Sequence, residues 1–246
     1  MQQLNARKAE KIPMPTDRRL YRISKALHQR QLDMVIALDC VHDQHNLSAV
    51  LRTADATGID RVVWVPDYKK PDTVNPEVSK GSERWVNLTV VDNLQPELAK
   101  FRRQGYKIAA THMGRDAVDF RTIDWTTPWV IVFGNEHRGC SEETVEAADV
   151  NIFLPMYGFV QSLNVSVAAA VTMYEVQRQR QNAGIYDASK SREQIDSLYS
   201  QWRLQDEEIP LEDLLVRPEG NIPPMEQPHS DGRGMRFLPK KKTENG

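Results

Sequence analysis

The sequence predicts an α/β fold in which a mainly parallel sheet carries helices on both faces. Six short apolar segments of strand length alternate with segments of helical pattern between about residues 34 and 182. This alternation is typical of parallel sheets. Hydrophobic residues make up 40% of the 246 residues, which is enough for a sizeable core. N- and C-terminal helical extensions are expected on either side of this central region.

The first helix is expected to run from Thr16 or Asp17, either of which can cap it, to about Arg30. Its apolar stripe comprises Leu20, Ile23 and Leu27, at spacings of three and four. Arg22 and Arg30 are eight residues apart, slightly more than two turns, so they project from neighbouring lines of one face. That face could follow a phosphate backbone.

The N-terminus is basic, because residues 1–30 contain eight Lys and Arg against two Asp and Glu. The whole chain is nearly balanced, with 32 basic and 34 acidic residues. A basic arm on a neutral or acidic body indicates a polyanionic partner that the arm contacts. A solvated, partly disordered N-terminus is the alternative interpretation, and charge alone does not exclude it.

The strands of the central region are expected at residues 34–41, 61–66, 85–91, 106–112, 129–133 and 152–154. The helices between them are expected at residues 47–57, 96–103 and 141–148. Asn46 is a good N-cap for the first of these helices, and Gly58 closes it. Gly105 ends the second helix, and Ser141 caps the third.

A long helix of small and apolar residues is expected from residue 165 to 176. It ends in the basic segment 177–180, where a helix C-terminus favours positive charge. Gln161, Ser162 and Asn164 form a polar cluster just before it. A helix cap explains one such residue but not easily all three, so the cluster indicates more than a buried helix.

The pattern weakens after residue 180. Residues 191–204 could form a helix that packs beside the first one. Residues 210–246 are rich in Pro, Gly and charge, and we expect a tail with little fixed structure there.

Several classes of protein are disfavoured by composition. Cys40 and Cys140 are far apart and lack ligand spacing, so no metal site is expected. Few cysteines fit a reducing compartment, and the N-terminus lacks the apolar core of a signal peptide. No run approaches the ~18 apolar residues that span a bilayer. We therefore expect a soluble cytoplasmic protein without a membrane partner.

Common nucleotide-binding motifs are also missing. No G-x-G-x-x-G follows the first strand, and residues 134–139 resemble a phosphate loop in glycine spacing only, because Cys140 stands in place of the lysine. The notable residues lie instead in three loops that follow strands, at residues 46–52, 134–139 and 154–164. Ligands of open parallel sheets bind at loops after the carboxyl ends of strands.

Three motifs in these loops carry a resemblance to a known family. They are NLSAVLRTA at residues 46–54, FGNE at residues 133–136 with Gly139, and LPM at residues 154–156 followed by SLNVSVA at residues 162–168. In this order they resemble the SpoU/TrmH-type branch of the SPOUT class of RNA methyltransferases, over about residues 34–182. The likeness is greatest to the enzymes that methylate guanosine 18 of tRNA, because the N-terminal extension is short and the chain continues after the third motif.

The resemblance implies a C-terminal trefoil knot, with the cofactor S-adenosylmethionine held in the knotted loops. It also implies a homodimer with the helix of the third motif in its interface. The expected reaction is methyl transfer to the ribose 2′-OH of guanosine 18 in the D-loop of tRNA. Residues 1–33 would be a basic RNA-binding arm and helix, residues 34–184 the methyltransferase domain, and residues 185–246 a C-terminal helix with a flexible tail.

The resemblance assigns roles to particular residues. The catalytic set comprises Asn46, Arg52, Glu136, Ser162 and Asn164. The cofactor-binding set comprises Thr111, Gly134, Leu154 and Leu163, and the RNA-binding set comprises Arg22, Arg30, Arg178 and Arg180. Arg52 has the central role of holding the phosphate beside the target ribose and easing alkoxide formation. A structural Arg52–Glu136 ion pair, and core packing of the two leucines, remain open as alternatives.

Other functions also remain open from the sequence. The same chemistry could act on an rRNA guanosine or on the wobble ribose of tRNA. A knotted RNA-binding protein without catalysis is disfavoured by the intact Asn46, Arg52, Glu136 and Asn164. A nucleotide-binding α/β enzyme unrelated to RNA is disfavoured by the missing phosphate loop.

Overall fold

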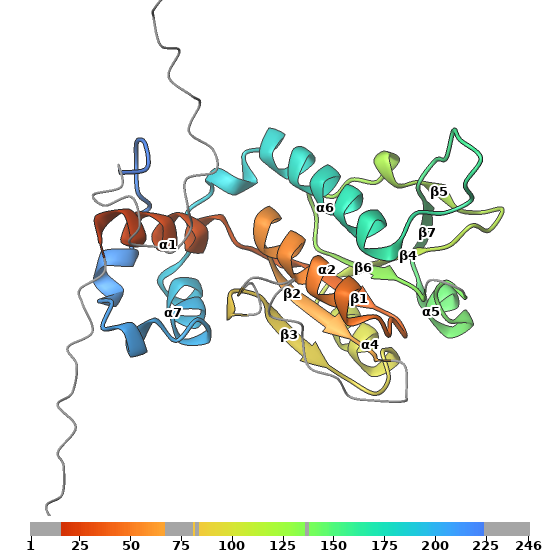
Figure 1. The fold of residues 1–246 in the computed structure, drawn as a ribbon, viewed down its shortest axis with the longest axis horizontal. Helices are drawn as coiled ribbons and strands as arrows, with labels where there is room; N and C mark the ends of the chain where they lie inside the picture. The colour runs from red at the N-terminus through yellow and green to blue at the C-terminus, as the bar shows by residue number, and fades with distance from the viewer. Residues whose placement is uncertain (1–15, 67–80, 82–83, 136–137, 224–246) are drawn as a thin grey trace, which may run out of the picture.

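The computed structural model describes residues 16–66, 81, 84–135 and 138–223 (Figure 1). Its centre is a seven-stranded sheet in the order β3-β2-β1-β6-β4-β7-β5, and all neighbouring strands are parallel. The strands are β1 (Gln31–Leu38), β2 (Ile59–Trp64), β3 (Asn87–Val90), β4 (Lys107–Thr111), β5 (Val118–Asp119), β6 (Trp129–Phe133) and β7 (Val150–Phe153). With helices on both faces, this sheet confirms the predicted α/β class.

The six predicted strands are all present, and β5 is an addition. It contains only Val118 and Asp119, which pair with β7 at the edge of the sheet. Two residues are too few for an alternating pattern, so no periodicity could have predicted β5. The strand order is consistent with the knot that the resemblance implies.

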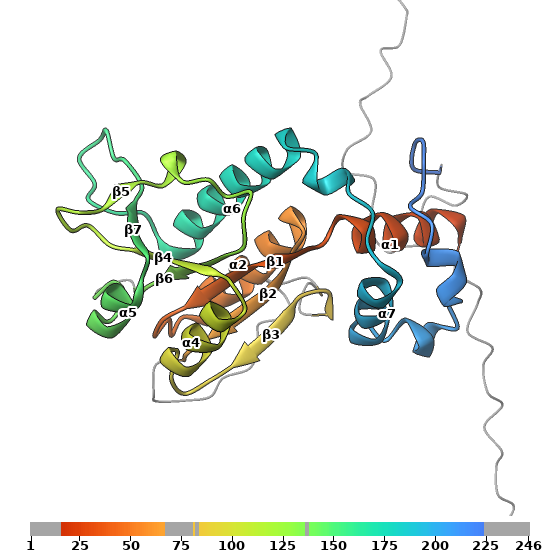
Figure 2. The same cartoon turned by 180° about the vertical axis from the view of Figure 1, so that it is seen from behind.

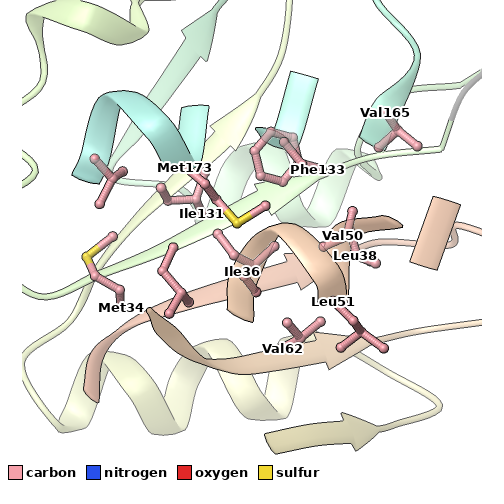
Figure 3. Close-up of a cluster of buried hydrophobic side chains, with 14 of the residues drawn as sticks. Met34, Ile36, Leu38, Val50, Leu51, Val62, Ile131, Phe133, Val165 and Met173 are labelled. Carbon is pink, nitrogen blue, oxygen red and sulfur yellow. The ribbon is translucent and has the colours of Figure 1, made fainter. Parts of the chain in front are cut away.

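Helices α2 (Gln44–Thr57) and α6 (Val165–Asn182) pack against each other on one face of the sheet (Figures 1 and 2). Their apolar side chains form one core with the central strands, in which Met173 lies near Ile131 and Phe133, and Leu51 lies beside Val62 (Figure 3). Burial of such side chains supplies about 1.5–3 kcal/mol each against solvent exposure. This packing therefore fixes the helix that carries Arg52 against the helix of the third motif.

Helices α4 (Gln95–Arg103) and α5 (Glu142–Ala147) cover the opposite face. Leu98 and Phe101 of α4 pack on Val130 and Val132 of β6 in a second core. The central strands are buried on both faces, which explains why they read as continuous apolar runs rather than alternating ones.

The start of α2 differs from the prediction. The helix begins three residues earlier than expected, and its N-cap is Asp43, whose side chain accepts a hydrogen bond from the His45 amide at 2.8 Å. Asn46 lies inside the first turn and is buried. Asp and Asn cap equally well, so the sequence alone did not distinguish them. The predicted closure at Gly58 is confirmed, with a left-handed φ of 77°.

Four short helices form a separate unit at one end of the sheet, which we call the helical extension (Figure 1). They are α1 (Asp17–Gln29), α7 (Arg192–Gln201), η4 (Leu204–Glu207) and η5 (Leu211–Leu214). Ile23 and Leu27 of α1 pack with Ile195, Leu198 and Trp202 in a third core. The predicted Thr16 cap, the apolar stripe of α1 and the position of α7 beside it are confirmed.

The expectation of a loose tail from residue 210 is wrong for residues 210–223. Leu214 is fully buried, and the segment runs along one face of α1. Tyr21 and Ser24 donate hydrogen bonds to the carbonyls of Gly220 and Val216, at 2.7 and 3.1 Å. Main-chain carbonyls accept such bonds whatever the side chains are, so composition did not reveal this contact. Residues 224–246 lie outside the described residues.

No helix among the described residues is long and apolar enough to cross a membrane. The same part of the chain contains no cluster of His, Cys, Asp and Glu with the arrangement of a metal site.

Candidate active site

The candidate active site lies at the carboxyl edge of the sheet. Strands β1, β6, β4 and β7 are consecutive neighbours, so the segments that follow them emerge side by side. Their described residues are 39–43, 134–135 with 138–141, 112–117 and 154–164. The first leads into α2 and the last into α6, which brings all three sequence motifs to one edge.

The turn after β6 is closely packed around Gly134. A Cβ atom built on Gly134 would lie 2.0 Å from both the Cys140 nitrogen and the Gly139 carbonyl carbon. Asn135 and Gly139 pair through both main-chain hydrogen bonds, at 2.9 and 2.8 Å. The chain therefore folds back on itself so tightly that only glycine fits at position 134.

Side chains outside the predicted set also hold this turn. The Asn135 Nδ2 donates to the Cys40 carbonyl at 2.8 Å, and both the amide and the hydroxyl of Ser141 donate to Asp39, at 2.9 and 2.8 Å. Sequence reasoning assigned none of these three side chains to the site, although it expected Ser141 as a helix cap. Two positions could have pointed to them: Asn135 lies inside the second motif, and Asp39 lies near the end of a predicted strand.

Arg52 and Asn46 occupy α2 but face different ways. Asn46 is buried beneath the helix, whereas the side chain of Arg52 is exposed. Six residues along a helix correspond to about 9 Å of rise, so direct contact between the two is not expected. Among the described residues, no hydrogen bond joins Arg52 to Asn46, Ser162 or Asn164. Glu136 lies outside the described residues, so both interpretations of its pairing with Arg52 stay predictions.

Asn164 is the N-cap of α6. Its Oδ1 accepts hydrogen bonds from the amide of Ser166 at 2.9 Å and from the hydroxyl of Ser166 at 2.6 Å. Ser162 is exposed two residues earlier. The capping role accounts for Asn164 structurally, and Ser162 has no such explanation among the contacts of the described residues.

The predicted cofactor residues lie at the ends of adjacent strands. Thr111 ends β4, Gly134 follows β6 and Leu154 follows β7, while Leu163 stands just before α6. Leu154 and Leu163 are half-buried, and Leu154 packs against the main core. Apolar side chains beside exposed main chain suit an adenine ring with its polar edge, so these residues fit a nucleoside cofactor.

Cys140 lies beneath the same turn. Its thiol is within 3.7 Å of the Thr111 hydroxyl. Burial raises the pKa of Cys140 to about 12, so the thiol stays neutral at physiological pH. Cys140 is therefore a packing residue and not a nucleophile.

The four predicted RNA-binding arginines divide into two exposed and two buried residues. Arg22 is exposed on α1. The side chain of Arg178 is 59% exposed and pairs with Glu175 at 2.7 Å. Both are accessible to a polyanion, and their contact with RNA stays a prediction.

Arg30 and Arg180 are buried and paired with carboxylates, which argues against the prediction that they contact RNA. The Arg30 side chain is 2% exposed, pairs with Asp55 of α2 and lies 4.9 Å above the Trp202 ring. The Arg180 side chain is 1% exposed and pairs with Asp33 at 2.5 Å. Arg30 stands in extended conformation after the last turn of α1, which turns it off the helical face that the spacing assumed.

Two cavities of about 540 and 250 Å³ lie away from the carboxyl edge. Arg84, Trp202 and Glu207 line the first, beside the helical extension. Arg30 and Tyr186 line the second, where α1 meets the sheet. Neither includes a predicted cofactor residue, so the assignment of the carboxyl edge rests on motif placement and chemistry.

The chain belongs to the SpoU rRNA Methylase family, whose sequence profile matches residues 33–174. One relative is the tRNA (guanosine(18)-2′-O)-methyltransferase of Aquifex aeolicus, which is 41% identical over 191 residues, covering 77% of this chain and 90% of the relative. The crystal structure of the A. aeolicus TrmH/SpoU tRNA modifying enzyme matches with a TM-score of 0.72 at 41% identity. That match covers 77% of this chain and 97% of the other.

A third match is the AdoMet-bound rRNA methyltransferase from Sinorhizobium meliloti. It has a TM-score of 0.52 and 28% identity, and the match covers 63% of this chain and 59% of the other. The family that the three motifs indicated is therefore confirmed, and so is the fold.

Proposed function

We propose that this protein transfers a methyl group from S-adenosylmethionine to the ribose 2′-OH of guanosine 18 in tRNA, in the cytoplasm. The observation that carries the proposal is the 41% identity over 191 residues with a relative named for this reaction. The exposed Arg52, in the first motif and on the helix that begins at the carboxyl edge, supports it from the structure.

The cofactor is assigned to the segments after β4, β6 and β7, near Thr111, Gly134, Leu154 and Leu163. S-adenosylmethionine supplies an activated methyl group on a sulfonium centre. The AdoMet-bound relative from S. meliloti supports this choice of cofactor. The chain itself must orient the ribose, keep water away and help remove one proton.

Arg52 is the residue assigned to the ribose side of the reaction. A guanidinium stays protonated at neutral pH, so Arg52 acts as a fixed positive charge that holds the phosphate beside the target ribose. That charge also lowers the cost of forming the alkoxide. Ser162 and Asn164 would order the third loop beside it, and Asn46 would set the first turn of α2. The proton passes to water or to the phosphate.

RNA binding is assigned to the helical extension and to α6, with Arg22 and Arg178 as phosphate contacts. The basic arm before residue 16 lies outside the described residues and is assigned the same role from its charge. The methyltransferase domain would span residues 34–184. The C-terminal unit after residue 185 would support α1 by packing against it. Contacts of this kind predict binding that weakens steeply with salt.

A second copy of the chain is assigned to the outer face of α6. Val167, Val171 and Tyr174 lie four and three residues apart and are exposed, which gives the helix an uncovered apolar stripe. Tyr157 and Phe159 in the preceding loop are also exposed. A homodimer would cover these side chains, and sedimentation of Val171→Asp should show a shift toward the monomer.

Replacement of Arg52 by Ala tests the proposed mechanism. Methyl transfer to tRNA should be abolished, while the affinity for S-adenosylhomocysteine, measured by calorimetry, should be unchanged. Arg103→Ala is the control, because Arg103 is an exposed arginine on α4, across the sheet from α2. Retained turnover in Arg52→Ala would remove Arg52 from the mechanism.

A further inference from the structure

The dipeptide Asp39–Cys40 contacts both ends of the turn that follows β6. At the entrance, the Asp39 amide donates to the Phe133 carbonyl at 2.9 Å, and the Cys40 carbonyl accepts from Asn135 Nδ2 at 2.8 Å. At the exit, Asp39 Oδ2 accepts from the amide and the hydroxyl of Ser141, at 2.9 and 2.8 Å. Two consecutive residues of one loop thus hold the turn where it begins and where it ends.

The dipeptide is itself held in an unusual state. Asp39 is 4% exposed, and Cys40 has a φ of 56°, in the left-handed region that favours glycine. A non-glycine residue keeps such a conformation only where its surroundings determine it, and such residues gather at functional sites. The bond from Asn135 to the Cys40 carbonyl is one of the contacts that fix it here.

The Asp39 carboxylate is held by directional contacts. Among the described salt bridges none involves Asp39, and both of its side-chain hydrogen bonds come from Ser141. A buried carboxylate depends on such donors, and the donors in turn are fixed by it. These hydrogen bonds therefore fix the position of Ser141 relative to Asp39, which a loose surface ion pair would not do.

The same loop leads directly into α2. Only residues 41–43 separate Cys40 from Gln44, the first residue of the helix that carries Arg52. The turn after β6 contains Gly134, which the proposed function assigns to the cofactor. The Asp39–Cys40 loop is therefore the covalent and hydrogen-bonded connection between the cofactor side and the ribose side of the site.

We propose that Asp39 is a positioning residue that, together with the Cys40 carbonyl, holds the cofactor turn in register with the start of α2. This inference rests on the proposed function, because it takes the turn to be part of the methyl-donor site. Loss of the link should loosen the turn and weaken the cofactor, while the core of the domain stays folded.

The test measures the affinity for S-adenosylhomocysteine by calorimetry in Asp39→Ala and Asp39→Asn. Asp39→Ala should weaken binding about tenfold, because both bonds to Ser141 are lost. Asp39→Asn keeps one oxygen that can accept from Ser141, so it should recover to within about threefold of the original protein. Ser141→Ala retains the main-chain donor and should show a similar small loss, which keeps the test usable if Asp39→Ala fails to fold.

Asp149→Ala is the matched control. Asp149 also accepts a main-chain hydrogen bond, from the Ile108 amide at 2.7 Å, but it lies before β7 at the opposite edge of the sheet. It should lower the thermal midpoint and leave cofactor affinity unchanged. Equal affinity in Asp39→Ala and the original protein, or equal losses in Asp39→Ala and Asp149→Ala, would overturn the inference. Absence of binding by the original protein would instead overturn the proposed function on which it rests.

Discussion

Arg180 offers the sharpest test of the buried arginines. Its side chain is 1% exposed and donates to Asp33 at 2.5 Å, to Gln31 at 2.8 Å and to the Trp125 carbonyl at 3.1 Å. Removal of one partner from a buried ion pair costs about 3–5 kcal/mol. The Asp33 side chain is 40% exposed and can regain water, so we expect Arg180→Ala to cost about 3 kcal/mol, at the lower end of that range.

A loss of this size should lower the thermal midpoint by roughly 6–12 °C in a chain of this length. The assay is thermal unfolding followed by circular dichroism, with all variants at one protein concentration because a dimer would make the midpoint concentration-dependent. Arg178→Ala is the control two residues away, since its side chain is 59% exposed. Arg178→Ala should leave the thermal midpoint nearly unchanged, because substitutions at exposed positions change stability little.

The two variants should also differ in tRNA binding. At a temperature where both remain folded, Arg178→Ala should weaken binding, and Arg180→Ala should bind as tightly as the original protein. An unchanged midpoint in Arg180→Ala together with weakened tRNA binding would refute the structural role of this residue.

Three further predictions concern single positions. Gly134→Ala should abolish S-adenosylhomocysteine binding in calorimetry and lower the thermal midpoint, because its Cβ would lie 2.0 Å from two main-chain atoms; unchanged binding would contradict the geometry of the turn. Burial lowers the pKa of His28, so the folded state disfavours its protonation and the free energy of unfolding should fall as pH drops below about 6.5. His28→Asn should flatten that dependence in urea titrations, and an unaltered pH profile would argue against it. Burial raises the pKa of Cys140 to about 12 from its ordinary 9.0. The unfolded chain therefore loses the thiol proton first, and the free energy of unfolding should fall as pH rises from 9 toward 12. Cys140 in the folded protein should resist iodoacetamide at pH 8.5, as mass spectrometry can show.

The strands and helices of the central region followed from the sequence because both faces of the sheet are covered. Segments such as residues 129–133 are apolar throughout, and every residue of β6 is buried. The site followed from the order of the three motifs, since a parallel sheet delivers the ends of its strands to one edge. β5 did not follow, because two residues show no period.

The remaining errors arose where tertiary contacts decide. Arg30 and Arg180 looked like surface charges in a helical projection, but Asp55 and Asp33 lie far from them in sequence and compensate their burial. Residues 210–223 looked disordered by composition, yet α1 holds them through main-chain carbonyls. Local pattern contains no information on partners so distant in the chain.

A methyl-transfer assay with labelled S-adenosylmethionine and unmodified tRNA transcripts would show whether the protein is a tRNA guanosine-18 methyltransferase. The product is mapped by nuclease digestion. We predict a single 2′-O-methylguanosine at position 18 in the D-loop, and none with Arg52→Ala. Label at the wobble ribose or in rRNA would contradict the assigned substrate while leaving the chemistry in place. Absence of transfer to any RNA, with S-adenosylhomocysteine still bound, would contradict the assignment of an enzyme and favour a knotted RNA-binding protein.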